Sequence, residues 1–215
     1  MNTDRLIDVL SANLEPVRPG QFGKALILAI LAGGGAALVL MLATVGLRPE
    51  LSTVHLEWTA AKLFFAVIVI GAGAPFLVRS IRPGMEEPTR LAVVVFPFFA
   101  AITLALATLL RVHPETWIEM LLGASPISSP RCFLCIVSFG AIPFAALIWV
   151  LRKGAPTRLR LSGALAGMVA GGVGAAAYAL NCNSDTIPFI AIWYSAAIAL
   201  CAVIGAQLGP RLLRW

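Results

Sequence analysis

The strongest constraint on this chain is a series of six long apolar runs, whose centres contain no Asp, Glu, Lys or Arg. A helix of about 20 apolar residues spans the hydrocarbon core of a bilayer and satisfies its own backbone hydrogen bonds there. We therefore predict an all-α fold, a six-helix transmembrane bundle. The predicted spans are Ala25 to Leu47, Leu63 to Val78, Leu91 to Leu110, Cys132 to Leu151, Leu161 to Leu180 and Phe189 to Leu208.

The composition agrees with this interpretation. Of the 215 residues, 60% are hydrophobic and only 12% are charged, against about 25% charged residues in a typical soluble domain. The net charge of +6 would suggest nucleic-acid binding in a soluble protein. In a membrane protein the same bias arises because Lys and Arg collect in cytoplasmic loops. We therefore expect the lipid bilayer as a partner and no direct binding of nucleic acid.

Lys and Arg are distributed unevenly between the two sides of the predicted bundle. Twelve of the 16 lie on the side that holds both chain termini. Such an excess marks the cytoplasmic side, so we expect a multi-pass protein whose amino and carboxy termini are both cytoplasmic. The four on the other, outer side are Arg48, Lys62, Arg111 and Arg131.

Residues 1–23 form the one segment outside the predicted spans that is long enough to contact a cytosolic partner. Its apolar residues recur at helical spacing until Pro16, which predicts a short amphipathic helix. A helix so short is marginal in water, so its apolar stripe must be buried against lipid, the rest of the chain or a partner. The stripe consists of Leu6, Val9, Leu10 and Leu14.

The predicted topology separates the four cysteines. Cys132 begins the fourth span and Cys182 lies in the short loop before the sixth, so both belong to the outer face. Cys135 lies one helical turn deeper than Cys132, and Cys201 lies about 20 Å below the outer surface at 1.5 Å per residue. We expect Cys135 and Cys201 to be packing residues.

An oxidising outer compartment permits a disulfide between cysteines whose Cα atoms lie about 4.4 to 6.8 Å apart. Cys132 with Cys182 is the pair that we expect to bond. Three roles remain open for it: a permanent staple, two small apolar residues, or a redox or metal switch. A metal site would use Cys132 and Cys182 with His113 or His55, but no close ligand spacing points to one. We expect no cofactor.

Two further patterns concern packing. Gly163, Gly167 and Gly171 recur at every fourth residue of the fifth span, which predicts a smooth stripe where another helix approaches closely. In the outer loop before the fourth span, the segment 113–122 predicts a short helix that starts near Pro114. Interfacial anchoring is the simpler role for this helix, and a lid or sensor surface is the alternative.

Several short segments, in the same order and at similar spacing, resemble the NrsF-type integral membrane anti-sigma factors of proteobacteria. The resemblance runs almost from end to end. It rests on Leu6-Ile7-x-x-Leu10-x-x-x-Leu14, Pro16-Val17-Arg18-Pro19, Pro130-Arg131-Cys132, Arg152-Lys153-Gly154-Ala155-Pro156, Tyr178-Ala179-Leu180-Asn181-Cys182, Asp185, Phe189 and Trp193-Tyr194.

This resemblance implies a receptor of the bacterial inner membrane and not an enzyme. It would hold an extracytoplasmic-function sigma factor inactive and release it under metal or oxidative stress. Residues 1–23 would bind the sigma factor through the apolar stripe, and residues 24–215 would form the six-span sensor domain. The two outer cysteines match the family pattern. Family members commonly carry His where Asn181 stands here, which weakens a metal site that needs an imidazole beside Cys182.

Two other functional classes can be compared with the sequence. A quinone-linked thiol oxidoreductase would use Cys132-x-x-Cys135 as its dithiol and normally needs a second outer dithiol, whereas only Cys182 remains outside. A small-molecule transporter or metal exporter needs polar groups near the membrane midplane, where these spans offer mainly isolated Ser and Thr. Both classes fit the sequence less well than a receptor.

Overall fold

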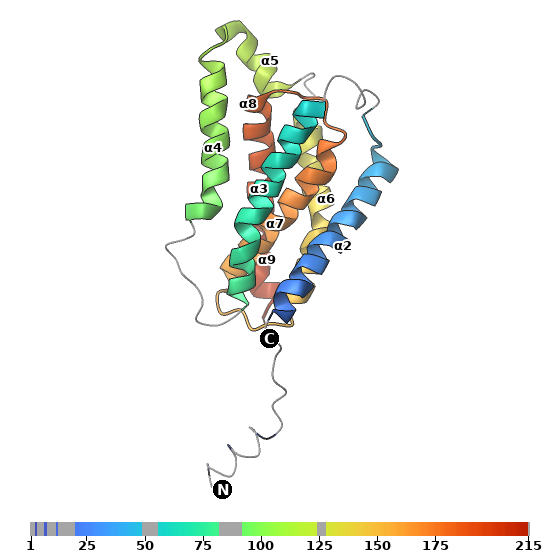
Figure 1. Cartoon of the computed structure of the whole chain (residues 1–215), viewed down its shortest axis with the longest axis vertical. Helices are drawn as coiled ribbons and strands as arrows, with labels where there is room; N and C mark the ends of the chain where they lie inside the picture. Colours follow the sequence, from blue (N-terminus) through green and yellow to red (C-terminus); the bar gives the residue numbers. More distant parts are fainter. Residues whose placement is uncertain are drawn as a thin grey trace.

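The computed structural model describes residues 20–48, 56–81, 92–123 and 128–214, together with Thr3, Ile7 and Ala12. Within these residues the regular structure is helical, and no strand occurs among them. Six helices are long and apolar enough to cross a membrane (Figure 1). The predicted all-α, six-helix bundle is therefore confirmed.

The spans follow one another up and down the bundle. The first five are α2 (Gln21–Thr44), α3 (Leu56–Ser80), α4 (Ala92–Leu109), α6 (Ser128–Leu151) and α7 (Leu159–Ala179). The sixth is built from α8 (Ile187–Phe189), a π-helical turn η3 (Ile190–Tyr194) and α9 (Ser195–Leu212). A short 3-10 turn η2 (Pro114–Thr116) and α5 (Trp117–Leu122) lie between α4 and α6.

Several predicted boundaries differ from the observed ones, those at the start of the second and first spans among them. The second span begins at Leu56 and not at Leu63, so Lys62 lies inside α3 and is fully buried. The predicted span starts directly after Lys62, because a charged residue interrupts an uncharged apolar run, so the lysine was expected in the loop before the span. The first span begins at Gln21, so the last residues of the segment 1–23 belong to α2.

Helix α7 occupies the centre of the bundle and packs against α9, α6, α3 and α2. Its Gly and Ala residues allow this, because small side chains let several helices approach one backbone at once. A Cβ atom built on Gly163 would collide with the carbonyl oxygen of Gly205, and one on Gly167 with that of Cys201. The glycine stripe therefore faces α9 at backbone contact.

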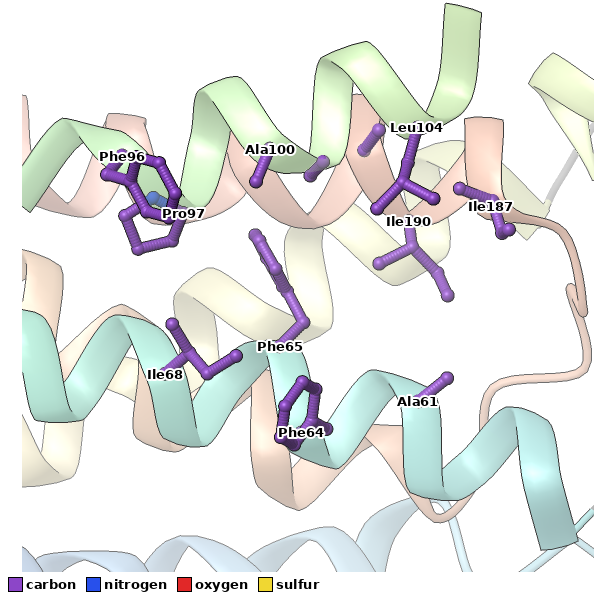
Figure 2. A pocket seen from close by; sticks show the side chains of 12 residues that line it. Ala61, Phe64, Phe65, Ile68, Phe96, Pro97, Ala100, Leu104, Ile187 and Ile190 are labelled. Atoms are coloured by element: carbon purple, nitrogen blue, oxygen red, sulfur yellow. The ribbon is translucent and has the colours of Figure 1, made fainter. Parts of the chain in front are cut away.

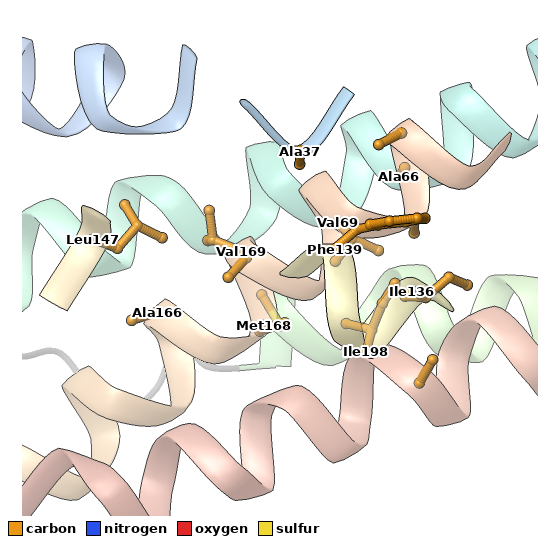
Figure 3. Close-up of a cluster of buried hydrophobic side chains, with 14 of the residues drawn as sticks. Ala37, Ala66, Val69, Ile136, Phe139, Leu147, Ala166, Met168, Val169 and Ile198 are labelled. Atoms are coloured by element: carbon orange, nitrogen blue, oxygen red, sulfur yellow. The ribbon is translucent and has the colours of Figure 1, made fainter. Parts of the chain in front are cut away.

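Buried side chains of α2, α3, α6 and α9 pack around α7 (Figure 3). They include Val69 of α3, Phe139 of α6 and Ile198 of α9 around Val169 of α7. The large apolar residues on the outer surfaces of the helices stay exposed, as Phe96 of α4 does at 68%. Such a surface is suited to lipid and not to water.

The two ends of the bundle differ. Helix α2 begins and α9 ends at one end, which we call the terminal end. Cys132 near the start of α6 and Cys182 between α7 and α8 lie at the other, which we call the thiol end. Helix α5 lies at the thiol end, far from the carboxy terminus (Figure 1).

Candidate functional site

Cys132 and Cys182 meet at the thiol end. Cys132 is fully buried and Cys182 is 3% exposed. Both are free thiols, and their side chains lie next to each other and interact directly. The structure thus brings together the two cysteines that the sequence placed at the same depth.

The other two cysteines lie apart from this pair. Cys135 is half-buried on α6. Cys201 lies in the contact between α9 and α7, where a Cβ atom on Gly171 would come within 3.3 Å of its sulfur. Cys201 is therefore surrounded by packed helix.

A buried ion network holds the loop that carries Cys182. The Lys62 ammonium donates to the Cys182 carbonyl and to Asp185 Oδ1, both at 2.8 Å. The Arg48 guanidinium donates to Asp185 Oδ2 at 2.8 Å and, more weakly, to the Cys182 carbonyl at 3.4 Å. The side chain of Asp185 is only 14% exposed. One carboxylate therefore connects the Cys182 loop with α3 and with the chain that follows α2.

Two further bonds join the same loop to the end of α2. The Arg48 amide donates to the Leu180 carbonyl at 3.3 Å. The Asn181 side-chain amide donates to the Gly46 carbonyl at 3.0 Å. Asn181 thus links the loop that carries Cys182 to the segment after α2. Gly46 has a φ of 79°, which a residue with a Cβ adopts only at a cost.

Helix α5 lies beside the start of the sixth span at the thiol end (Figure 1), and polar side chains bind the carbonyls of its last turn. Thr186 Oγ1 donates to Met120 at 2.7 Å, Trp193 Nε1 to Leu121 at 2.8 Å, and Ser129 Oγ to Leu122 at 3.0 Å. These bonds satisfy carbonyls that a helix end otherwise leaves unpaired. The short helix predicted in this segment is present, and it is attached to the loop and to the sixth span.

The environment of Cys182 favours its thiolate. Its pKa is lowered because the Cys132 thiol donates to it and the Lys62 charge attracts the anion, although burial acts in the opposite direction. The hydroxyl of Tyr194, in the π-helical turn, is next to the same sulfur. Burial acts to raise the pKa of Asp185, but the hydrogen bonds and the positive charges of Lys62 and Arg48 together lower it below its usual value. A thiolate is the reactive form of cysteine, so this pair is suited to thiol chemistry.

Among the residues that the structure describes, no three His, Cys, Asp or Glu side chains come together as a metal site. His113 is exposed in the turn before α5. His55 lies outside the described residues, as do Leu6, Val9, Leu10 and Leu14 of the predicted sigma-factor-binding stripe. At the thiol end the described side chains therefore supply two sulfurs and an ion network.

An apolar cavity of about 300 Å³ lies beside the site, between α3, α4 and the sixth span (Figure 2). All of its lining residues are apolar, among them Phe65, Phe96 and Ile190. No lining side chain can ionise or attack a substrate. The cavity thus contributes no chemistry to the thiol pair.

Sequence reasoning missed Lys62, Arg48 and Tyr194 as members of the site. Lys62 and Arg48 were counted only as flanking charges, and Tyr194 only as part of a resembling segment. Both cations lie on the side of the bundle with few positive charges, where the positive-inside rule does not explain them. The presence of two cations on this side was the signal from which the site could have been predicted. Asp185 in the loop was the acidic residue that could pair with them.

Substituting Asp185 tests the network. Asp185→Asn leaves the buried Lys62 ammonium without the carboxylate that it binds. We expect the free energy of unfolding to fall by about 3 kcal/mol, the lower part of the range for a broken buried ion pair, because Asp185 keeps some exposure. Adding Lys62→Met should restore part of the loss by removing the unpaired charge. Unfolding in detergent measures both effects, and a double variant no more stable than Asp185→Asn would contradict the expectation.

Known proteins match this chain over most of its length. The NrsF family, described as negative regulator of sigma F, matches residues 10–215. A probable anti-sigma-F factor NrsF of Azospira oryzae is 33% identical over 217 residues, and an anti-sigma-F factor NrsF of Caulobacter vibrioides is 34% identical over 226 residues. Each alignment covers the whole of both chains. No solved structure matches.

Proposed function

This chain belongs to the NrsF family of negative regulators of sigma F. We propose that it is an inner-membrane anti-sigma factor that binds an extracytoplasmic-function sigma factor and senses thiol-reactive stress. The observation that carries this proposal is the buried, adjacent pair Cys132 and Cys182 at the end of the bundle opposite both termini. In the proposed orientation the thiol end faces outward and the terminal end faces the cytoplasm. The protein would act as a receptor and not as an enzyme.

The input is a change in the thiol pair. Formation of a disulfide, or binding of a thiol-seeking metal, would alter the contact between the start of α6 and the loop before α8. These are the outer ends of the fourth, fifth and sixth spans. The lowered pKa of Cys182 supports this role, because the thiolate reacts with oxidants and soft metals.

The output is the release of the sigma factor from residues 1–23. The apolar stripe Leu6, Val9, Leu10 and Leu14 would bind in a groove of the sigma factor, as amphipathic helices do in other complexes. Packed helices switch between discrete arrangements more readily than they deform. A small change at the thiol end can therefore reach the segment that precedes α2.

The direct test is binding of the full-length protein in detergent to candidate extracytoplasmic-function sigma factors from the same organism. We expect one of them to bind and Leu10→Asp to weaken binding at least about tenfold, because burial of an unpaired carboxylate costs well over 1.4 kcal/mol. The binding constant is measured with the membrane protein immobilised on a sensor surface and the sigma factor supplied in solution.

The matched control is Ser11→Asp, which adds the same charge next to Leu10 on the polar face of the predicted helix. This variant should bind like the wild type. Equal loss in both variants would indicate a general effect of charge and contradict the proposed stripe. Absence of binding in all forms would remove the sigma factor as a partner, and detectable thiol-oxidase turnover would then favour the oxidoreductase interpretation.

A further inference from the structure

The loop that carries Cys182 is bound to the end of α2, in addition to its ion pair with Lys62 of α3. Leu180 and Asn181 are hydrogen-bonded to Arg48 and Gly46, and Asp185 accepts from the Arg48 guanidinium. Arg48 is itself buried at 7% exposure. We call these five residues, Gly46, Arg48, Leu180, Asn181 and Asp185, the α2 clamp.

Helix α2 is also the span that continues directly into residues 1–20 at the terminal end. It lies at the edge of the bundle (Figure 1), where it packs mainly on α6 and less on α7. Near its middle, Gly33 contacts α6 so closely that a Cβ atom there would come within 2.7 Å of Pro143 Cα. The helix is thus held at its middle by a backbone contact and at the thiol end by the clamp.

Oxidation of the thiol pair is the step that would move the loop. The two S–H bonds break and an S–S bond forms, while a diazene oxidant such as diamide takes up the two protons and two electrons. The new bond is about 2.05 Å long, shorter than any hydrogen bond between thiols. In such a mechanism the loop would be drawn toward α6, and the end of α2 that is bound to the loop would move with it.

We propose that α2 is the helix that carries the signal, and that Arg48 and Asn181 are the residues that connect it to Cys182. Movement of the loop would tilt α2 about the contact between Gly33 and Pro143, so that its first turn shifts at the terminal end. The inference rests on the proposed function, since it gives the route between the thiol pair and residues 1–23. It assigns to Arg48 and Asn181 a positioning role and no chemistry.

The test follows the position of α2 in the full-length protein without any sigma factor. Spin labels carried by noncanonical keto amino acids replace Lys24 in the first turn of α2 and Arg160 in the first turn of α7, so that the native thiols stay unlabelled. Both positions are exposed. Diamide should form the Cys132–Cys182 disulfide and shift the distance distribution between the labels. In the double variant Arg48→Met, Asn181→Ala, we expect the disulfide to form to the same extent without that shift.

Thr186→Val is the matched control. It removes two hydrogen bonds of the same loop, one to the Met120 carbonyl of α5 and one from the Phe189 amide of α8, and neither joins α2. The oxidation-dependent shift should therefore persist. In the double variant Arg48→Lys, Asn181→Ala, much of the shift should return, because the lysine again places a cation next to Asp185. Should the double variant not fold, Asn181→Ala alone is used and should reduce the shift at least by half. A full shift in the folded clamp variants, or no shift in the oxidised wild type, would overturn the proposal.

This outcome is separable from the sigma-factor test. The wild type can bind and release a sigma factor while α2 stays in place, in which case the signal takes another helix. Conversely, α2 can move on oxidation in a protein that binds no sigma factor, which would contradict the proposed function and leave the route through α2 intact.

Discussion

Gly167→Ala is expected to lower the free energy of unfolding by about 3 kcal/mol, the upper part of the usual range for overpacking a core. The added Cβ atom would collide with the Cys201 carbonyl oxygen and lie 3.1 Å from the Cα of Ala202. Both are backbone atoms, so no side-chain rotation relieves the contact. Helices α7 and α9 would have to separate along the crossing that Gly163 and Gly205 share.

The direction of this effect is the opposite of what helix propensity predicts. In a helix interior Ala is more favourable than Gly by about 1 kcal/mol. Gly71→Ala on α3 is the matched control, because a Cβ atom there meets nothing within 4 Å. Its stability should equal or slightly exceed that of the wild type. Unfolding of both variants in mixed micelles measures the difference, and equal stabilities would show that the α7 stripe tolerates a larger separation.

Cys182→Ser is expected to abolish the release of the sigma factor by diamide while leaving the resting repression intact. Serine keeps the size of the side chain, so the loop and its ion network should persist. It cannot form a disulfide with Cys132 or act as a thiolate, so the proposed input is lost. Transcription from a sigma-dependent promoter, which should rise with diamide in the wild type, should stay at its resting level in the variant. Cys132→Ser should behave in the same way.

Cys135→Ser and Cys201→Ser provide the controls within the same chain. Neither residue belongs to the adjacent pair, and Cys201 lies within the contact between α7 and α9. Both variants should therefore respond to diamide like the wild type. A normal response in Cys182→Ser, or a lost response in Cys201→Ser with a stable fold, would contradict the role of the outer pair.

The sequence was sufficient for those features that depend on local composition. An apolar run such as that from Ala25 identifies a span by its length, because the bilayer supplies the solvent and the helix satisfies its own backbone. A glycine at every fourth residue of α7 identifies a packing stripe, because helical periodicity places the three on one face. The common depth of Cys132 and Cys182 follows from the order of the spans alone.

Other features depend on partners that are remote in the sequence. Asp185 binds Lys62 across 123 positions and Arg48 across 137. A residue-by-residue count treats Lys62 as the end of an apolar run, since the cost of a buried charge is removed only by a partner that the count does not include. The π-helical turn that places Tyr194 beside Cys182 has no local pattern either, and a single continuous helix was predicted there.

The sequence by itself therefore determined the six spans, the close contact of the α7 glycines and the grouping of Cys132 and Cys182 at one end of the bundle, because periodicity and hydropathy are properties of consecutive residues. Only the tertiary structure decided that the Cys182 loop is bound to the end of α2 and that a buried lysine accompanies the thiols. These contacts arise where segments from different spans meet in space, and their energies exist only when both partners are in place.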